Sequence, residues 1–170
     1  MSTRSMLFLL LFLLAIFLAV RFDVPTQVKM GVTNLIYGGE MREMKGFRVV
    51  VETLTPELEK EGLTRKALLE ELSTTLEKGG IRVLDDAEWQ KTPGNPVLNV
   101  TVHATKAEEG RYQYSVTFEV GKSEGPDSGA YSEKIKTLWL TSGMGEGGVS
   151  DIRARIKEEA RFFMKSHSGS

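Results

Sequence analysis

The sequence contains few residue combinations that could do chemistry, and the first is an acidic run at residues 85–88 (DDAE). Carboxylates gathered in this way could serve as a general acid and a general base. A structural interpretation explains them more simply: Asp85 caps a short helix, the other acids favour its positive N-terminal end, and Trp89 covers an edge of the core. We favour this interpretation and assign no catalytic residue.

Three glycines form a second candidate motif. Gly143, Gly145 and Gly148 have the G-x-G-x-x-G spacing between an expected strand and an expected helix, where backbone amides can approach a phosphate. Glu146 lies inside the segment, however, and no further strand follows to complete a dinucleotide-binding fold. We therefore expect a flexible reversal of the chain, or a strip of backbone that meets a partner.

The composition offers little for metal or covalent chemistry. The chain has no cysteine, which excludes disulfides, thiol catalysis and the lipid-modified cysteine of a bacterial lipoprotein. Its two histidines, His103 and His167, are too few for a histidine-based metal site, and no nucleophile has an evident base. The net charge of -1 provides no electrostatic footprint for nucleic acid. We expect no cofactor, no metal, no nucleic acid and no enzymatic activity.

The first 22 residues predict the location of the protein. Arg4 precedes an unbroken apolar run at residues 6–20, which Arg21 and Asp23 close. As a helix the run spans roughly 22 Å, short of the roughly 30 Å hydrocarbon core of a bilayer, a length that suits a signal peptide. Yet the small residues of a signal peptidase site are missing after it, and flanking residues can extend a short span at the interface.

Residues 1–22 therefore predict an uncleaved N-terminal membrane anchor. A cleaved signal segment is the alternative, and a cytosolic protein with a hydrophobic N-terminus is a third reading. The N-terminal amine and Arg4 favour a cytoplasmic N-terminus, although Arg21 and Lys29 weaken the charge bias. We expect a single-pass protein of the inner (cytoplasmic) membrane with its globular domain in the periplasm or extracytoplasmic space, or a secreted protein if the segment is cleaved.

Four segments follow from the changes in composition. Residues 1–22 are the anchor or signal, residues 23–46 a tether interrupted by proline and glycine, residues 47–165 the extracytoplasmic domain, and residues 166–170 a tail that is disordered by composition.

Within the domain, apolar periodicity predicts a strand at residues 47–51 and a helix that begins at Thr64 and stops at residues 79–80 (GG), with leucines every four residues. A short strand at 81–84, parallel to the first, should follow. Residues 98–104 and 112–120 alternate strictly between apolar and polar, a last long strand covers 131–141, and Ser150 begins the final helix.

This order predicts an α+β fold: a two-layer sandwich with one mixed sheet of about five strands and two main helices on one face (β-α-β-β-β-β-α), preceded by an N-terminal transmembrane or signal helix. The other face of the sheet should be open. Its polar side chains are the candidate partner-binding residues, Asn99, Thr101, His103, Arg111, Gln113, Ser115 and Thr117. An ordinary solvated face is the alternative interpretation, and His103 has no carboxylate or serine placed to work with it.

Several segments together resemble small bacterial envelope domains. RVVVETL, LTRKALLEELSTTLEKGGIRVL and PVLNVTVHA, followed by YQYSVTFEV and a tryptophan strand, are similar to the lipopolysaccharide-assembly lipoprotein E family and to the amino-terminal domain of the TolB family. The resemblance covers about residues 47–165 and lies in core positions, so it carries over no catalytic residue. The lipidation cysteine is missing here. The resemblance implies a non-enzymatic envelope accessory domain.

These observations lead to one functional expectation and one alternative. We expect a membrane-tethered periplasmic or extracytoplasmic accessory subunit that binds a larger membrane or envelope protein complex. The alternative is a domain that binds a lipid or an envelope polymer.

Overall fold

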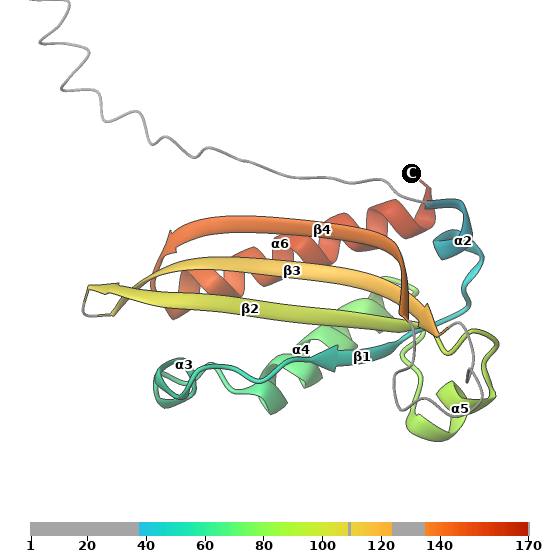
Figure 1. The fold of residues 1–170 in the computed structure, drawn as a ribbon, viewed down its shortest axis with the longest axis horizontal. Helices are drawn as coiled ribbons and strands as arrows, with labels where there is room; N and C mark the ends of the chain where they lie inside the picture. The colour runs from blue at the N-terminus through green and yellow to red at the C-terminus, as the bar shows by residue number, and fades with distance from the viewer. Residues whose placement is uncertain (1–37, 109, 124–134, 170) are drawn as a thin grey trace, which may run out of the picture.

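The structure is a computed structural model that describes residues 38–108, 110–123 and 135–169. These residues form one mixed four-stranded sheet and five helices, an α+β fold (Figure 1). The strands, in spatial order, are β1 (Arg48–Val51), β2 (Val97–Glu108), β3 (Arg111–Ser123) and β4 (Ile135–Gly147). The helices are α2 (Gly38–Glu43), α3 (Pro56–Lys60), α4 (Arg65–Lys78), α5 (Asp86–Lys91) and α6 (Val149–Ser168). The expected class is confirmed, with four strands instead of about five.

The predicted strand at residues 81–84 does not form. It makes one parallel bridge, between Val83 and Phe47, in which the Leu84 amide donates to the Phe47 carbonyl at 2.9 Å. Asp85 follows at once and caps α5, so the chain leaves the sheet edge before a second pair of residues can align. The prediction of five strands was wrong for this reason.

The remaining strands are paired as a mixed sheet. β1 runs parallel to β2, and β2, β3 and β4 form an antiparallel meander. Val100 lies opposite Phe118, and both are fully buried, whereas the neighbouring pair Thr101 and Thr117 is only partly buried. The alternation expected for the two central strands is therefore confirmed, and it divides the sheet into an apolar and a polar face.

The two long helices cover the apolar face together (Figure 1). Helix α4 packs against β1 and buries Leu68, Leu72 and Leu76, while α6 packs against β3 and β4 and also contacts α4. Phe163 of α6 lies edge-on to Phe47 at 5.5 Å between ring centroids. Burial of each large apolar side chain contributes about 1.5–3 kcal/mol, so this layer holds the fold together.

The ends of the helices follow local capping rules. Thr64 accepts a hydrogen bond from the Ala67 amide at 3.3 Å and begins α4 as predicted. Gly80, after its C-terminus, has a φ of 82° that favours glycine. The predicted cap of α6 was wrong: the helix begins after Gly148, whose amide donates to Asp151 Oδ2 at 2.8 Å, and Ser150 lies within its first turn.

Gly143 and Gly145 belong to strand β4 and Gly148 directly precedes α6, so the glycine segment is not a loop. Gly143 and Gly145 lie opposite Val116 and Tyr114 of β3, on the face that α6 covers. A Cβ atom on Gly145 would lie 2.6 Å from the Tyr114 hydroxyl oxygen, and one on Gly143 would lie 2.7 Å from Arg155 Cδ of α6. The glycines therefore let side chains approach the strand closely, which explains their spacing without a phosphate.

Both ends of the described chain meet at one end of the molecule. Residues 38–43, within the segment expected to be a tether, form α2, and Met41 is fully buried. Helix α6 continues through residues 166–168, which were expected to be a disordered tail. The Arg42 Nε atom donates to the Ser166 carbonyl at 3.3 Å, and His167 Nε2 lies 3.1 Å from the Met44 carbonyl oxygen.

The predicted anchor at residues 1–22 lies outside the described residues. Within the described part of the chain, none of the helices has both the length and the apolar character needed to cross a membrane.

Candidate partner-binding face

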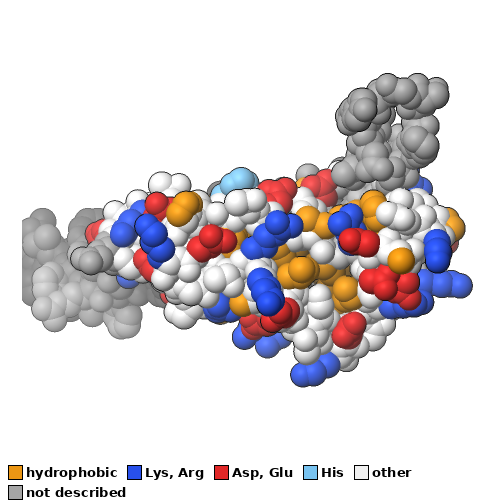
Figure 2. All heavy atoms as spheres, turned by 90° about the horizontal axis from the view of Figure 1, so that it is seen from below, with side chains coloured by type: hydrophobic (Ala, Val, Ile, Leu, Met, Phe, Trp, Pro, Cys, Tyr) orange, Lys and Arg blue, Asp and Glu red, His pale blue; other side chains and the backbone are white. Residues whose placement is uncertain are grey.

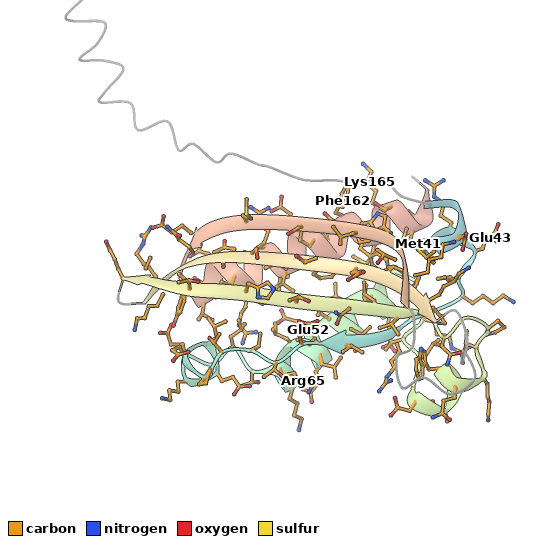
Figure 3. The ribbon with its side chains drawn as sticks, viewed as in Figure 1. Met41, Glu43, Glu52, Arg65, Phe162 and Lys165 are labelled. Carbon is orange, nitrogen blue, oxygen red and sulfur yellow. The ribbon has the colours of Figure 1, made fainter. Side chains whose placement is uncertain are left out.

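The polar face of the sheet is the face turned toward the viewer in Figure 3, and none of the described helices covers it. All seven predicted residues lie on it. His103 of β2 is directly opposite Ser115 of β3, and Asn99 is opposite Glu119. Because residues i and i+2 of a strand point the same way, the register brings these side chains into one surface. We call this surface the open face.

Three of the seven predicted residues, Asn99, Arg111 and Thr117, have side-chain hydrogen-bond partners among the described residues. The Thr117 and Ser142 hydroxyl oxygens lie 2.9 Å apart, and Arg111 Nη2 donates to Glu146 Oε1 at 2.9 Å. The hydrogen bond to Glu146 raises the pKa of Arg111 further above its ordinary value. Such exposed pairs add little stability, but they hold the side chains in fixed positions that a partner could recognise.

Asn99 is hydrogen-bonded toward the edge of the sheet, whereas His103 has no such partner in the described part of the chain. Asn99 reaches sideways to the β1 edge, where its Nδ2 donates to Glu52 Oε1 at 2.9 Å. His103 is exposed and has no hydrogen-bond partner among the described residues. It has no serine nucleophile or carboxylate bonded to it, so nothing in its surroundings would activate it as a general base.

Sequence reasoning missed the apolar part of the open face. Met144 of β4, opposite Ser115, is 56% exposed, and Leu140 lies on the same face opposite Glu119. Met144 was missed because residues 143–148 were expected to be a loop. Leu140 lay within the predicted strand at residues 131–141 but was not assigned to a face. Residues 140–146 (LTSGMGE) do not alternate between apolar and polar residues, so no periodic signal in the sequence placed Leu140 and Met144 on the open face.

A depression of about 440 Å³ hollows the β1 end of the open face. Val50 and Val97 form apolar parts of its lining, and Asn99 and Glu119 supply polar groups. The Arg48 guanidinium lies 4.7 Å from the ring centroid of Trp89 and forms an ion pair of 3.0 Å with Asp86. Figure 2, seen from the side of β1 and α5, shows hydrophobic side chains exposed between acidic and basic ones.

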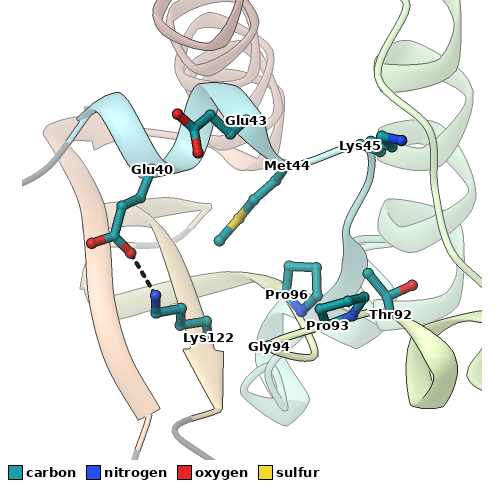
Figure 4. A pocket seen from close by; sticks show the side chains of 9 residues that line it. All are labelled: Glu40, Glu43, Met44, Lys45, Thr92, Pro93, Gly94, Pro96 and Lys122. Atoms are coloured by element: carbon teal, nitrogen blue, oxygen red, sulfur yellow. Dashed lines mark hydrogen bonds and ion pairs between the residues drawn. The ribbon is translucent and has the colours of Figure 1, made fainter.

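A second hollow, of about 490 Å³, lies between α2 and the loop before β2 (Figure 4). Glu40 on its rim accepts hydrogen bonds from Lys122 at 2.5 Å and from Lys136 at 3.2 Å. These lysines hold the pKa of Glu40 below its ordinary value, the Lys122 hydrogen bond most strongly. Met44 and Pro96 contribute apolar surface. Its charges are mutually compensated, so the hollow shows no preference for a ligand of one sign.

The acidic run at residues 85–88 behaves as a helix cap. Asp85 Oδ1 accepts a hydrogen bond from the Glu88 amide at 2.7 Å, which confirms the predicted capping role. Glu88 pairs instead with Arg82. Among the residues that the structure describes, no group of three or more His, Asp or Glu side chains could hold a metal ion.

Two titratable groups with raised pKa values lie away from the open face. Burial raises the pKa of Glu159, which packs under β4, and a hydrogen bond from the phenol to Glu61 raises the pKa of Tyr112 to about 12. Their side chains face the helix layer, so these shifts reflect packing and do not point to chemistry at the open face.

A scan against protein-family models and searches of curated proteins and of solved structures found no match to this chain. Functional inference therefore rests on the sequence and on the geometry of the open face.

Proposed function

We propose that this protein is a membrane-tethered periplasmic or extracytoplasmic accessory subunit that binds a larger membrane or envelope protein complex through the open face. Residues 1–22 anchor it as a single-pass protein of the inner membrane, and its role is binding, not catalysis. The observation that carries the proposal is that one complete side of the four-stranded sheet is left without a covering helix in the described chain.

The composition of the open face supports a protein partner. Its centre is polar and held by cross-strand hydrogen bonds, while Met144 and Leu140 at one side and Val50 and Val97 at the other add apolar area. Protein interfaces commonly combine apolar contact area with well-placed polar groups. A large exposed methionine is also adaptable in shape and suits a contact surface.

Affinity purification from detergent extract tests the partner. A double variant, Arg111→Glu with Gln113→Glu, changes the charge of the open face while leaving its backbone intact. We expect a stoichiometric protein partner with the wild-type chain and clear loss of it with the variant, at a stability cost within about 0.5 kcal/mol because both residues are exposed. Arg111 also loses its pair with Glu146, an exposed interaction of small energy.

A matched control changes the net charge equally elsewhere. Arg65→Glu with Gln90→Glu alters exposed residues of α4 and α5, away from the open face, and should leave co-purification unchanged. Equal loss of the partner in both double variants would mean that net charge, and not the open face, governs binding. Full retention by the Arg111 and Gln113 variant would remove the open face from the contact.

The mature N-terminus tests the tether. We expect an intact mass that includes residues 1–22 and a protein that stays with membranes after a high-salt wash. A mature species that begins between residues 21 and 31 would replace the anchor with a cleaved signal and leave an exported location in place.

The depression beside Trp89 favours a second candidate, a domain that binds a lipid or an envelope polymer. An aromatic ring with neighbouring Asn99 and Glu119 side chains offers both stacking and hydrogen bonds. A co-purifying lipid or glycan without a protein partner, lost in a Trp89→Ala variant, would support this candidate over the first.

A further inference from the structure

The chain enters the described domain beside the C-terminal turns of α6. Helix α2 contacts both α6 and β4, and Arg42 and His167 tie the two segments together through backbone carbonyl groups. Everything N-terminal to residue 38, including the apolar run at residues 6–20, is connected to the domain at this point. A tether to a membrane would therefore be attached at this end of the domain.

The surface at this end contains an exposed aromatic side chain. Phe162 is 38% exposed, and Met144 on the open face is the other large hydrophobic side chain that is exposed within the described ranges. The centroid of the Phe162 ring lies 6.0 Å from that of the buried Trp139 ring, so packing holds the Phe162 side chain in place. Figure 3 shows Phe162 and Lys165 near each other on α6, on the side of α2.

Basic residues lie near Phe162 along α6 and on α2. Arg161 and Lys165 are exposed neighbours on α6, and Arg42 of α2 reaches the Ser166 carbonyl. No acidic side chain of the described residues pairs with any of the three. Glu43 of α2 and Glu158 of α6 are exposed acids in the same region, and Glu158 is paired with Arg155, so the three cations outnumber the acids near them. We call Phe162, Arg161, Lys165 and Arg42 the tether-side patch.

We propose that the tether-side patch docks on the surface of a phospholipid bilayer, with the Phe162 ring among the headgroups and the three cations on anionic lipids. This inference rests on the membrane tether of the proposed function. Aromatic side chains and basic residues are the groups that favour the membrane interface. The link at residues 21–37 can extend to about 60 Å, so the tether allows docking without enforcing it.

Tethering makes a weak patch sufficient. The anchor keeps the domain within reach of the bilayer at high effective concentration, so a few contacts shift the balance between docked and free domain. Docking through α6 leaves the open face, on the other side of the sheet, available to a protein partner. The patch thus orients the domain as well as holding it.

Single-cysteine labelling tests this proposal, because the natural chain has no cysteine. The full-length Phe162→Cys protein carries an environment-sensitive fluorophore and is reconstituted in vesicles of phosphatidylcholine and phosphatidylglycerol, with or without brominated acyl chains. We expect blue-shifted emission that brominated lipid quenches. The matched control, Met144→Cys, replaces the other exposed hydrophobic residue and should stay in water, unquenched.

Charge reversal tests the role of the cations. In the labelled protein, Lys165→Glu should lower the ratio of docked to free domain by about fivefold or more, and vesicles of phosphatidylcholine alone should have a similar effect. A label at Arg161→Cys reports on the same patch if replacing Phe162 disturbs Trp139.

Three outcomes would overturn the docking. The first is a fluorophore that stays in water at both position 162 and position 161. The second is a fluorophore that is shielded from water but not quenched by brominated lipid, which would mean that protein covers the patch. The third is quenching at position 144 equal to that at position 162. A protein that stays in the membrane fraction while the labelled patch is exposed to water would still support the membrane tether of the proposed function. Quenching at the patch with no co-purifying protein would instead contradict the accessory-subunit function.

Discussion

Thr141 of β4 donates a hydrogen bond of 3.0 Å to Oε2 of Glu159, a buried carboxylate on α6. The Arg155 guanidinium lies farther away, at 3.9 Å from Oε1 of the same group. Glu159 thus sits between strand and helix with one short hydrogen bond and a distant ion pair. Burial, the largest influence, raises the pKa of this carboxyl above its ordinary value.

The contribution of Glu159 to the free energy of unfolding should therefore decrease as the pH rises. Because the folded state binds the Glu159 proton more tightly than the unfolded state, its contribution is present at low pH. It is lost as the pH rises from the ordinary glutamate pKa, about 4.3, through the raised value. Glu159→Gln stays neutral and keeps an acceptor for Thr141, so its stability relative to wild type should improve as pH rises.

Denaturant unfolding at mildly acidic and neutral pH measures this difference. Glu70→Gln, at an exposed position on α4 with a 3.9 Å ion pair to Lys66, is the control and should show no such trend. A constant difference between Glu159→Gln and wild type across the pH range would show that the buried carboxyl does not govern the pH dependence.

Gly143 should not tolerate a methyl group. Its Cβ would overlap the Arg155 and Glu159 side chains of α6, so in Gly143→Ala these two side chains must shift from their places against β4. We expect a loss of about 1–3 kcal/mol of unfolding free energy. Gly39→Ala, in helix α2 with nothing within 4 Å of the new atom, should be neutral or slightly stabilising. Equal midpoints for the two variants would contradict the close packing of α6 on β4.

Phe118 and Thr117 test the two faces of the sheet. Phe118→Ala removes a fully buried ring and should cost about 3–5 kcal/mol. Thr117→Ala loses one partly exposed hydrogen bond to Ser142 and should cost at most about 1 kcal/mol. Denaturant midpoints of the two variants give the contrast, and similar losses would mean that the register of β3 is wrong.

Tyr112 should titrate at unusually high pH. Its hydroxyl donates to Glu61 Oε1 at 2.7 Å, and this hydrogen bond, with burial and the nearby negative charge, raises the phenol pKa to about 12. The folded state then holds the proton more tightly, so the contribution to stability is lost as pH rises from about 10 to about 12.

Ultraviolet titration of the phenolates checks this value. Tyr112→Phe should remove the phenolate that appears near pH 12. Burial also raises the pKa of Tyr114, so Tyr114→Phe is the comparison and should leave the Tyr112 phenolate in place. If Tyr112→Phe removes a phenolate that titrates near its ordinary value instead, the Glu61 hydrogen bond is not maintained in solution.

Local patterns in the sequence determined the parts of the fold that depend on neighbouring residues. The cap at Thr64, the leucines of α4 and the alternation along β3 were all predictable, since helix ends and strand faces follow from backbone hydrogen bonding and side-chain period. The same alternation placed the seven polar residues on one surface.

Only the tertiary structure decided what depends on distant contacts. β4 continues through its glycines because Tyr114 and α6 fill the space that Cβ atoms would occupy. Residues 81–84 fail as a strand because α5 draws the chain away after a single bridge. The depression combines Trp89 of α5 with residues of β1, β2 and β3, and Phe162 lies beside α2, because packing brings together residues remote in sequence. Such placements depend on non-local contacts, which single-sequence periodicity does not encode.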